Sequence, residues 1–191
     1  MKHEIITSQD VKVIGISKEM PFTKGPEECP KFWNEFFQKY VKPVIDGATP
    51  DAVQKAVFDN HVGQYAVCDC NRAKKDCCNC GEEALSECGG KFRYIIAGKY
   101  QGGYVPEGMT LIDLPDGEWI KFHFEGGMSA FQEQYNYVFK NWIPNHKDIV
   151  ANSDMLVEWY EGDDISSPDY KCGVMLHIQQ HYNPAIGLLL L

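Results

Sequence analysis

The chain has 191 residues, with 18 Lys and Arg against 27 Asp and Glu, a formal net charge of −9 and a pI near 5.1. This balance argues against a nucleic-acid surface, because phosphate binding needs a basic face. The length suffices for one domain with its own core, and aromatic residues, at 13%, are frequent. An acidic chain rich in aromatics suits neutral or cationic aromatic ligands.

Neither end of the chain is expected to be a targeting or membrane segment. The N-terminal residues include no apolar run of signal-peptide length, so we expect a cytoplasmic protein. The apolar tail from Ala185 to Leu191 is far shorter than the roughly 20 residues that span a bilayer. No membrane partner is expected.

The first half predicts a strand, a helix and two further strands. Apolar residues from Val11 to Ile16 indicate the first strand. His61–Cys68 and Lys91–Tyr100 indicate a strand pair. Between them, apolar residues at three- and four-residue spacing predict an amphipathic helix ended by Pro43; they are Phe32, Trp33, Phe36, Phe37, Tyr40 and Val41.

The second half predicts the same elements in the same order. Strands at 109–114 and 118–124 flank a Pro-Asp-Gly turn, and alternation in the second strand leaves one face apolar. Ser129 and Gln132 match a capping box, which places the start of a helix there, and Pro144 is predicted to end it. Strands follow at 155–160 and 171–180.

The two helix ends align without a gap, which indicates a duplicated unit. Residues 37–43, FQKYVKP, lie over residues 138–144, VFKNWIP, with the lysine and the proline identical. We therefore predict one α+β domain over 1–191, with repeat one at about 11–100, a cysteine-rich insertion at 68–90 and repeat two at about 109–180. Two strand-helix-strand-strand units related by a pseudo-twofold axis would form an antiparallel sheet whose two main helices enclose a ligand cleft.

Glu158 is the sharpest single candidate for chemistry. It interrupts an apolar strand, and alternation places Leu156, Glu158 and Tyr160 on one face and Met155, Val157 and Trp159 on the other. If that face lines the cleft, the carboxylate could pair with a cationic ligand, or act as a general acid or base with Tyr160 assisting. The alternative is a glutamate that simply faces solvent.

Five further residues are candidate ligand contacts because they lie near strand centres or at loops that could border the cleft. They are Phe22, Tyr65, Tyr94, Trp119 and His177. Each alone is more often a core residue, and a single strand histidine is usually satisfied by its surroundings.

Six of the eight cysteines fall in one window, at Cys68, Cys70, Cys77, Cys78, Cys80 and Cys88. Thiolates at this spacing could hold a structural zinc, although it is not the usual pair of C-x2-C hooks. A reduced hairpin loop and redox or disulfide chemistry are the alternatives. No cofactor is expected in the cleft, because P-loop, dinucleotide-binding, nucleophile-elbow and zinc-protease motifs are absent from the sequence.

Several segments, taken in order, resemble the GyrI-like small-molecule-binding domain, which is also the effector-binding domain of AraC-type and MerR-type drug-responsive regulators. The segments that carry the resemblance are 92–98, 105–109, 112–119, 141–144 and 158–160. No helix-turn-helix accompanies them, so direct DNA reading is not expected.

The resemblance implies an aromatic pocket in which a strand glutamate, here Glu158, faces lipophilic and often cationic compounds. It favours a stand-alone binding protein that sequesters or senses such drugs or toxins. Some stand-alone members of the family that the chain resembles look like cofactor-free hydrolases, which open cyclopropane rings of alkylating natural products. The alternative is therefore a hydrolase with Glu158 as acid or base. A gyrase-type protein-interaction module is a third hypothesis, suggested by the acidic run at 161–164. An oligomer is compatible with every one of these.

Overall fold

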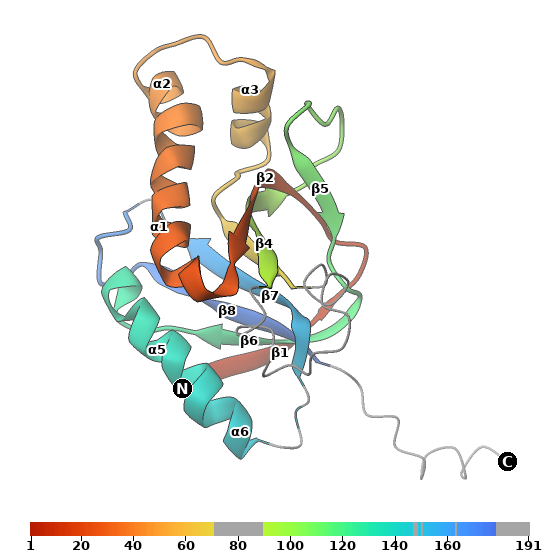
Figure 1. Cartoon of the computed structure of the whole chain (residues 1–191), viewed down its shortest axis with the longest axis vertical. Helices are drawn as coiled ribbons and strands as arrows, with labels where there is room; N and C mark the ends of the chain where they lie inside the picture. The colour runs from red at the N-terminus through yellow and green to blue at the C-terminus, as the bar shows by residue number, and fades with distance from the viewer. Residues whose placement is uncertain (71–89, 147–148, 150, 163, 179–191) are drawn as a thin grey trace, which may run out of the picture.

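The computed structural model describes residues 1–70, 90–146, 149, 151–162 and 164–178. One antiparallel sheet of eight strands has the spatial order β1-β6-β8-β7-β3-β4-β2-β5 (Figure 1). The strands are β1 Lys2–Ser8, β2 Lys12–Pro21, β3 Tyr65–Asp69, β4 Lys91–Lys99, β5 Thr110–Asp113, β6 Gly117–His123, β7 Ala151–Glu161 and β8 Lys171–Ile178. The predicted α+β class is confirmed.

Two helical segments lie on the same side of this sheet (Figure 1). The first contains η1 Phe22–Lys24, α1 Gly25–Phe36, η2 Phe37–Val41 and α2 Lys42–Ile45, and α3 Ala52–Asp59 follows it. The second contains η4 Gly127–Ala130, α5 Phe131–Tyr137, η5 Val138–Trp142 and α6 Ile143–Asn145. None of the helices in the described part of the chain is long and apolar enough to cross a membrane.

The six inner strands carry the predicted duplication. In the spatial order β6-β8-β7-β3-β4-β2, the first three strands form one unit and the last three form the other, in mirrored order. Each unit contains one single strand and one hairpin. Along the chain, the helical segment of each unit lies between its first and second strands. The units meet where β3 pairs with β7, and Ala66 lies opposite Glu158 at this join. The centre of the sheet is therefore the boundary between the halves.

The two prolines predicted to end the helices lie inside continuous helical segments instead. Pro43 and Pro144 each occupy the first turn of a short continuing helix, and the five residues before that helix form a π-helical turn. These turns, at 37–41 and 138–142, coincide in the alignment of the halves. A proline lacks an N–H and crowds the carbonyl four residues earlier, so the wider turn accommodates it. In the first copy, Gln54 Nε2 donates to that carbonyl, Lys39 O, at 3.1 Å.

Helix starts also differ from the sequence prediction. Ser129 does not cap α5, because its hydroxyl donates to Gly126 O at 2.9 Å and a 3-10 turn precedes the helix. A capping box exists instead at Asp51 and Gln54, at the start of α3. Helix α3 and strand β1 were not predicted, since both are short or polar on their exposed side.

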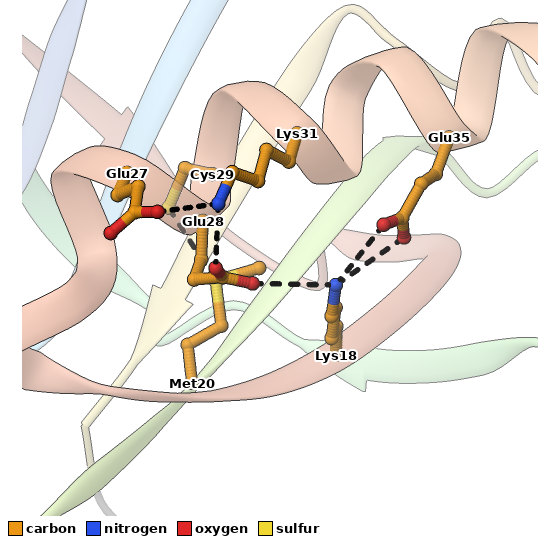
Figure 2. A network of polar contacts seen from close by, with 7 residues as sticks. All are labelled: Lys18, Met20, Glu27, Glu28, Cys29, Lys31 and Glu35. Atoms are coloured by element: carbon orange, nitrogen blue, oxygen red, sulfur yellow. Dashed lines mark hydrogen bonds and ion pairs between the residues drawn. The ribbon is translucent and has the colours of Figure 1, made fainter.

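Helix α1 is fastened to β2 by ion pairs on its outer side (Figure 2). Lys18 Nζ of β2 lies 3.3 Å from Glu35 and 3.7 Å from Glu28, and Lys31 Nζ lies 3.3 Å from Glu28. Behind them, Cys29 Sγ lies 3.7 Å from Met20 Sδ. Surface pairs contribute about 0–1 kcal/mol each, and only the two pairs of Lys18 join α1 to β2.

The sheet curls away from the helices. β1 and β2 lie near opposite ends of the strand order, yet only three residues link them, and the same is true of β5 and β6. Three residues span about 14 Å at most, whereas six strand spacings of a flat sheet measure about 28 Å. The two links bond to each other through Leu114 N to Val11 O at 2.8 Å. We call the side covered by α1 and α5 the helix face, and the opposite, enclosed side the far face.

Three clusters fill the molecule. On the helix face, one cluster lies under α1 and another under α5. On the far face, a single cluster joins both ends of the sheet to its centre, with Val13 and Leu114 from one end, Trp119 from the other and Val157 from the middle. The predicted alternation of β7 is confirmed, because Met155, Val157 and Trp159 belong to this cluster.

Gly98 allows the turn after α3 to press against β4. A Cβ atom at this position would lie 1.9 Å from Asn60 O and 2.7 Å from the carbonyl carbon of His61. We expect Gly98→Ala to lower the free energy of unfolding in urea by about 1–3 kcal/mol, because backbone atoms must move.

Gly25→Ala is the matched control, since its added Cβ would meet only the Phe92 ring, at 3.3 Å. We expect it to change the free energy of unfolding by less than about 1 kcal/mol. Equal effects of the two substitutions would contradict the packing argument.

Candidate functional site

A pocket of about 860 Å³ opens on the helix face between α1 and α5, where the two halves meet. Nine aromatic side chains line it, drawn from both halves, and its other lining residues are mostly aliphatic or sulfur-containing. The aromatic residues are Phe22, Trp33, Phe92, Tyr94, Phe131, Tyr135, Phe139, Tyr160 and Tyr170. This is a large, mostly apolar space with few polar groups, the usual composition of a small-molecule site.

Glu158 lies on the floor of this pocket. Its strand, β7, is central in the sheet, and its direct neighbours there are Ala66 on β3 and Val174 on β8, both fully buried. Directly opposed residues share a face, and these two neighbours are small and apolar. They leave room above the sheet and offer the carboxylate no partner.

Two phenols hold one oxygen of this carboxylate. Tyr94 OH donates to Glu158 Oε2 at 2.7 Å, and Tyr160 OH donates to the same atom at 2.8 Å. Trp33 Nε1 donates to Tyr94 OH at 3.0 Å, which leaves the phenol proton of Tyr94 directed to the carboxylate. Glu158 Oε1 receives no hydrogen bond from the described residues, so this oxygen remains available to a ligand.

The electrostatics of the pocket are set by this one group. Glu158 is the only charged side chain among the described lining residues. Burial raises the pKa of Glu158 above its ordinary value, and the hydrogen bonds from Tyr94 and Tyr160 partly oppose this shift. Burial and the charge of Glu158 raise the pKa of both phenols well above the ordinary value, so they remain donors.

Both helices contact the phenol of Tyr160. The indole of Trp33 on α1 meets it edge-on, with ring centroids 5.5 Å apart at 85°, and Phe131 on α5 stacks on it at 5.9 Å and 27°. Aromatic pairs at these separations are favourable. The position of each helix is thereby coupled to the group that binds Glu158.

The predicted site residues divide between the two faces of the sheet. Glu158, Tyr160, Tyr94 and Phe22 line the pocket together. Tyr65, Trp119 and His177 lie on the far face, and the structure does not bring them together with Glu158. His177 Nε2 lies 3.0 Å from Asp116 O, and its ring lies 5.3 Å from that of Trp119, which is a structural role. Ligand contact by these three remains a prediction without support from this pocket.

The cysteine hypothesis falls largely outside the described residues. Cys68 and Cys70 line the pocket, whereas Cys77, Cys78, Cys80 and Cys88 lie outside the described part of the chain. Among described residues no group of three or more His, Cys, Asp or Glu could hold a metal. Burial raises the pKa of Cys29 to about 12, and that of Cys68 rises for the same reason, so both are thiols. Structural zinc in the insertion remains a prediction.

Sequence reasoning missed much of the aromatic wall. Trp33, Phe131 and Tyr135 line the pocket, and they lie in the apolar stripes of the two helices rather than among the predicted ligand contacts. Trp33 and Tyr135 are only half-buried in the folded chain. The available signal was the width of these stripes, because a helix that only packs on a sheet needs fewer large rings than these two helices carry.

The curled sheet, the two helices and an acidic aromatic pocket between duplicated halves define a small-molecule-binding α+β protein. Residues 80–177, just over half of the chain, match the model of the GyrI-like small molecule binding domain. The chain belongs to this family. No curated protein matches it by sequence.

Solved structures share the fold at low sequence identity. SAV2435, solved bound to tetraphenylphosphonium, has a TM-score of 0.68 at 15% identity, covering 96% of this chain and 99% of its own. A protein of Staphylococcus aureus MU50, described as a candidate transcription regulation protein, has a TM-score of 0.66 at 15% identity, with 94% and 99% covered. An integron cassette protein of Vibrio cholerae has a TM-score of 0.59 at 10% sequence identity, and the match covers 93% of this chain and 95% of that protein. Such likeness shows the fold alone.

The raised pKa of Glu158 predicts how its replacement alters stability. The folded protein retains a proton that the unfolded chain releases above the ordinary value of 4.5. The carboxyl therefore favours folding at low pH, and this contribution is lost as pH rises through the folded-state pKa. We expect Glu158→Gln to melt about 2 °C or more above the parent at pH 8, with a smaller difference at pH 4.5.

Glu118→Gln, at an exposed position of β6, removes the same charge away from the pocket, and its effect on melting temperature should not follow this pattern. Thermal unfolding of the three proteins at both pH values gives the comparison. If the melting-temperature difference between Glu158→Gln and the parent does not grow with pH, the raised pKa of Glu158 does not limit the stability of the parent.

Proposed function

We propose that the chain binds bulky aromatic cations in the pocket between α1 and α5, with Glu158 as their charge partner. The observation that carries this proposal is the free Oε1 of Glu158, the one charged group among the described lining residues, at the floor of an aromatic space. Anions would meet the carboxylate unfavourably and would find no described cationic side chain in the lining.

A cation with spread charge fits better than a compact one. Leaving water is costly for a small, strongly hydrated ammonium, and aromatic walls cannot replace its hydration shell. A lipophilic cation gives up little hydration and is attracted to the ring faces as well as to the carboxylate. The pocket volume of about 860 Å³ admits several rings at once.

The cation also relieves a cost that the empty pocket carries. Removing Glu158 from water disfavours its charged form, and only two phenols compensate within the described structure. A bound cation would restore the charged form and lower the pKa of Glu158. The SAV2435 structure with tetraphenylphosphonium supports the size and the charge of the proposed ligand class. Sequestration or sensing of such compounds is the role that follows.

Tetraphenylphosphonium is a direct probe of the proposal. We expect Glu158→Gln to weaken its binding by about 10- to 100-fold in isothermal titration calorimetry at pH 7.5, because the variant keeps the shape and loses the charge. Binding to the parent should also weaken as pH falls through the raised pKa of Glu158.

Two controls separate pocket charge from general effects. Glu118→Gln, equally charged but exposed and outside the pocket, should bind like the parent. Neutral triphenylphosphine oxide should bind parent and Glu158→Gln with similar affinity. If the cation binds Glu158→Gln as tightly as the parent, charge pairing is not the basis of recognition.

A cofactor-free hydrolase that uses the same pocket is the second candidate, and the two phenols on Glu158 favour it. A carboxyl whose pKa is raised by burial, and which lies beside phenol donors, is suited to accept or release a proton. We expect turnover of cyclopropane-bearing aromatic alkylators, followed by mass spectrometry, to yield less than one equivalent of product per protein if the chain only binds. Product above one equivalent that disappears in Glu158→Gln would make it an enzyme.

A further inference from the structure

A second hollow, of about 640 Å³, lies on the far face of the sheet. Its walls come from the two ends of the curled sheet, and its floor comes from the centre. On β7, Glu158 lines the aromatic pocket and Trp159 lines the far-face hollow, whereas Tyr160 borders both spaces. The sheet separates the two spaces except beside Tyr160.

The chemistry of this hollow is opposite to that of the aromatic pocket. Its aromatic floor holds Trp119 and Trp159, which are 2% and 4% exposed, with Tyr65 beside them. Two lysines, Lys99 and Lys121, also line it. Lys121 Nζ lies 4.2 Å from the centroid of the Trp159 ring, so an ammonium group is held directly against the aromatic floor.

These two lysines have no acidic partner among the described residues, whereas the nearby carboxylates are already engaged. Glu161, at the rim, lies 3.1 Å from Lys171 Nζ. Glu4, opposite Lys121 across the β1–β6 pair, lies 2.9 Å from His123 Nε2. The hollow thus presents positive charge that the described chain does not neutralise.

We propose that the far-face hollow is a second binding site, which takes a flat aromatic carboxylate or sulfonate. The ring of the ligand would lie beside the half-buried Tyr65, above the floor formed by the indoles, and its anionic group would accept hydrogen bonds from Lys121 and Lys99. Polar residues at the rim, Thr7, Ser8, Gln9 and Gln64, supply further hydrogen-bonding groups. A gap left by imperfect core packing would lack this polar rim and these unpaired charges.

The geometry of the hollow also favours a small ligand over a macromolecule. The short β1–β2 and β5–β6 links close one side of it, and they are held together by Leu114 N to Val11 O and by Asp10 N to Asp116 Oδ1, both 2.8 Å. A space bounded by bonded strands is preformed, so a rigid ligand loses little on binding.

The probe is 2-naphthoate, measured by isothermal titration calorimetry, with neutral 2-naphthalenemethanol as its uncharged counterpart. We expect naphthoate to bind saturably and the alcohol to bind at least about tenfold more weakly. Lys121→Met should weaken naphthoate by about tenfold or more. Lys140→Met, an exposed lysine outside both spaces, should leave it unchanged.

Two further measurements locate the probe. Saturating tetraphenylphosphonium and Glu158→Gln should leave naphthoate affinity within about twofold of the parent, because they act across the sheet. Lys99→Met gives an independent variant if Lys121→Met proves unfolded by circular dichroism. Three results would each contradict the second site. They are an absence of saturable naphthoate binding, displacement of naphthoate by tetraphenylphosphonium, and a Lys140→Met variant whose naphthoate binding is weakened as much as that of Lys121→Met.

Discussion

The site depends on one constraint, a half-buried carboxylate at the join of the two halves that has no cationic partner among the described residues. Glu158 is held from one side only, by phenols on a single oxygen. Desolvation outweighs these hydrogen bonds, because the pKa of the group is raised in spite of them. The arrangement is costly for the empty protein, and it leaves the remaining oxygen open to the proposed cation.

The duplication explains how this arrangement is assembled. The acid and Tyr160 come from the second half, whereas Tyr94 and Trp33, which complete the hydrogen-bonded chain, come from the first. Neither half alone would contain it. Because α1 and α5 both pack on the phenol of Tyr160, a shift of either helix would alter the hydrogen bonds to the carboxylate. The repeated π-helical turns at aligned positions also show that the copies kept their backbone geometry, while the side chains at the join diverged.

The sequence predicted most helices and strands, but it did not predict which side of the sheet the residues of different strands share. Alternation within β7 was enough to separate Glu158 from Trp159, and the helix-end alignment was enough to predict the two units. Tyr65, Trp119 and His177 were grouped with Glu158 because alternation fixes a face only within one strand. Which face of β6 or β8 matches which face of β7 depends on register, and register is set by pairing across the sheet. The curl that separates the two spaces arises from two short links whose consequence appears only once the strand order is known.

A single strand thus divides two environments of opposite charge. On the helix face, β7 presents an acid among rings, and on the far face it presents an indole against which Lys121 lies. On the helix face this arrangement carries a cost to folding, because the desolvated Glu158 has no cationic partner among the described residues. Stability spent in this way is most readily understood as preorganisation, since groups already removed from water and already oriented need little rearrangement when a ligand of the opposite charge arrives. For the proposed cationic ligands, this cost would favour a cation over a neutral compound in the aromatic pocket, because a neutral compound leaves Glu158 without a charge partner.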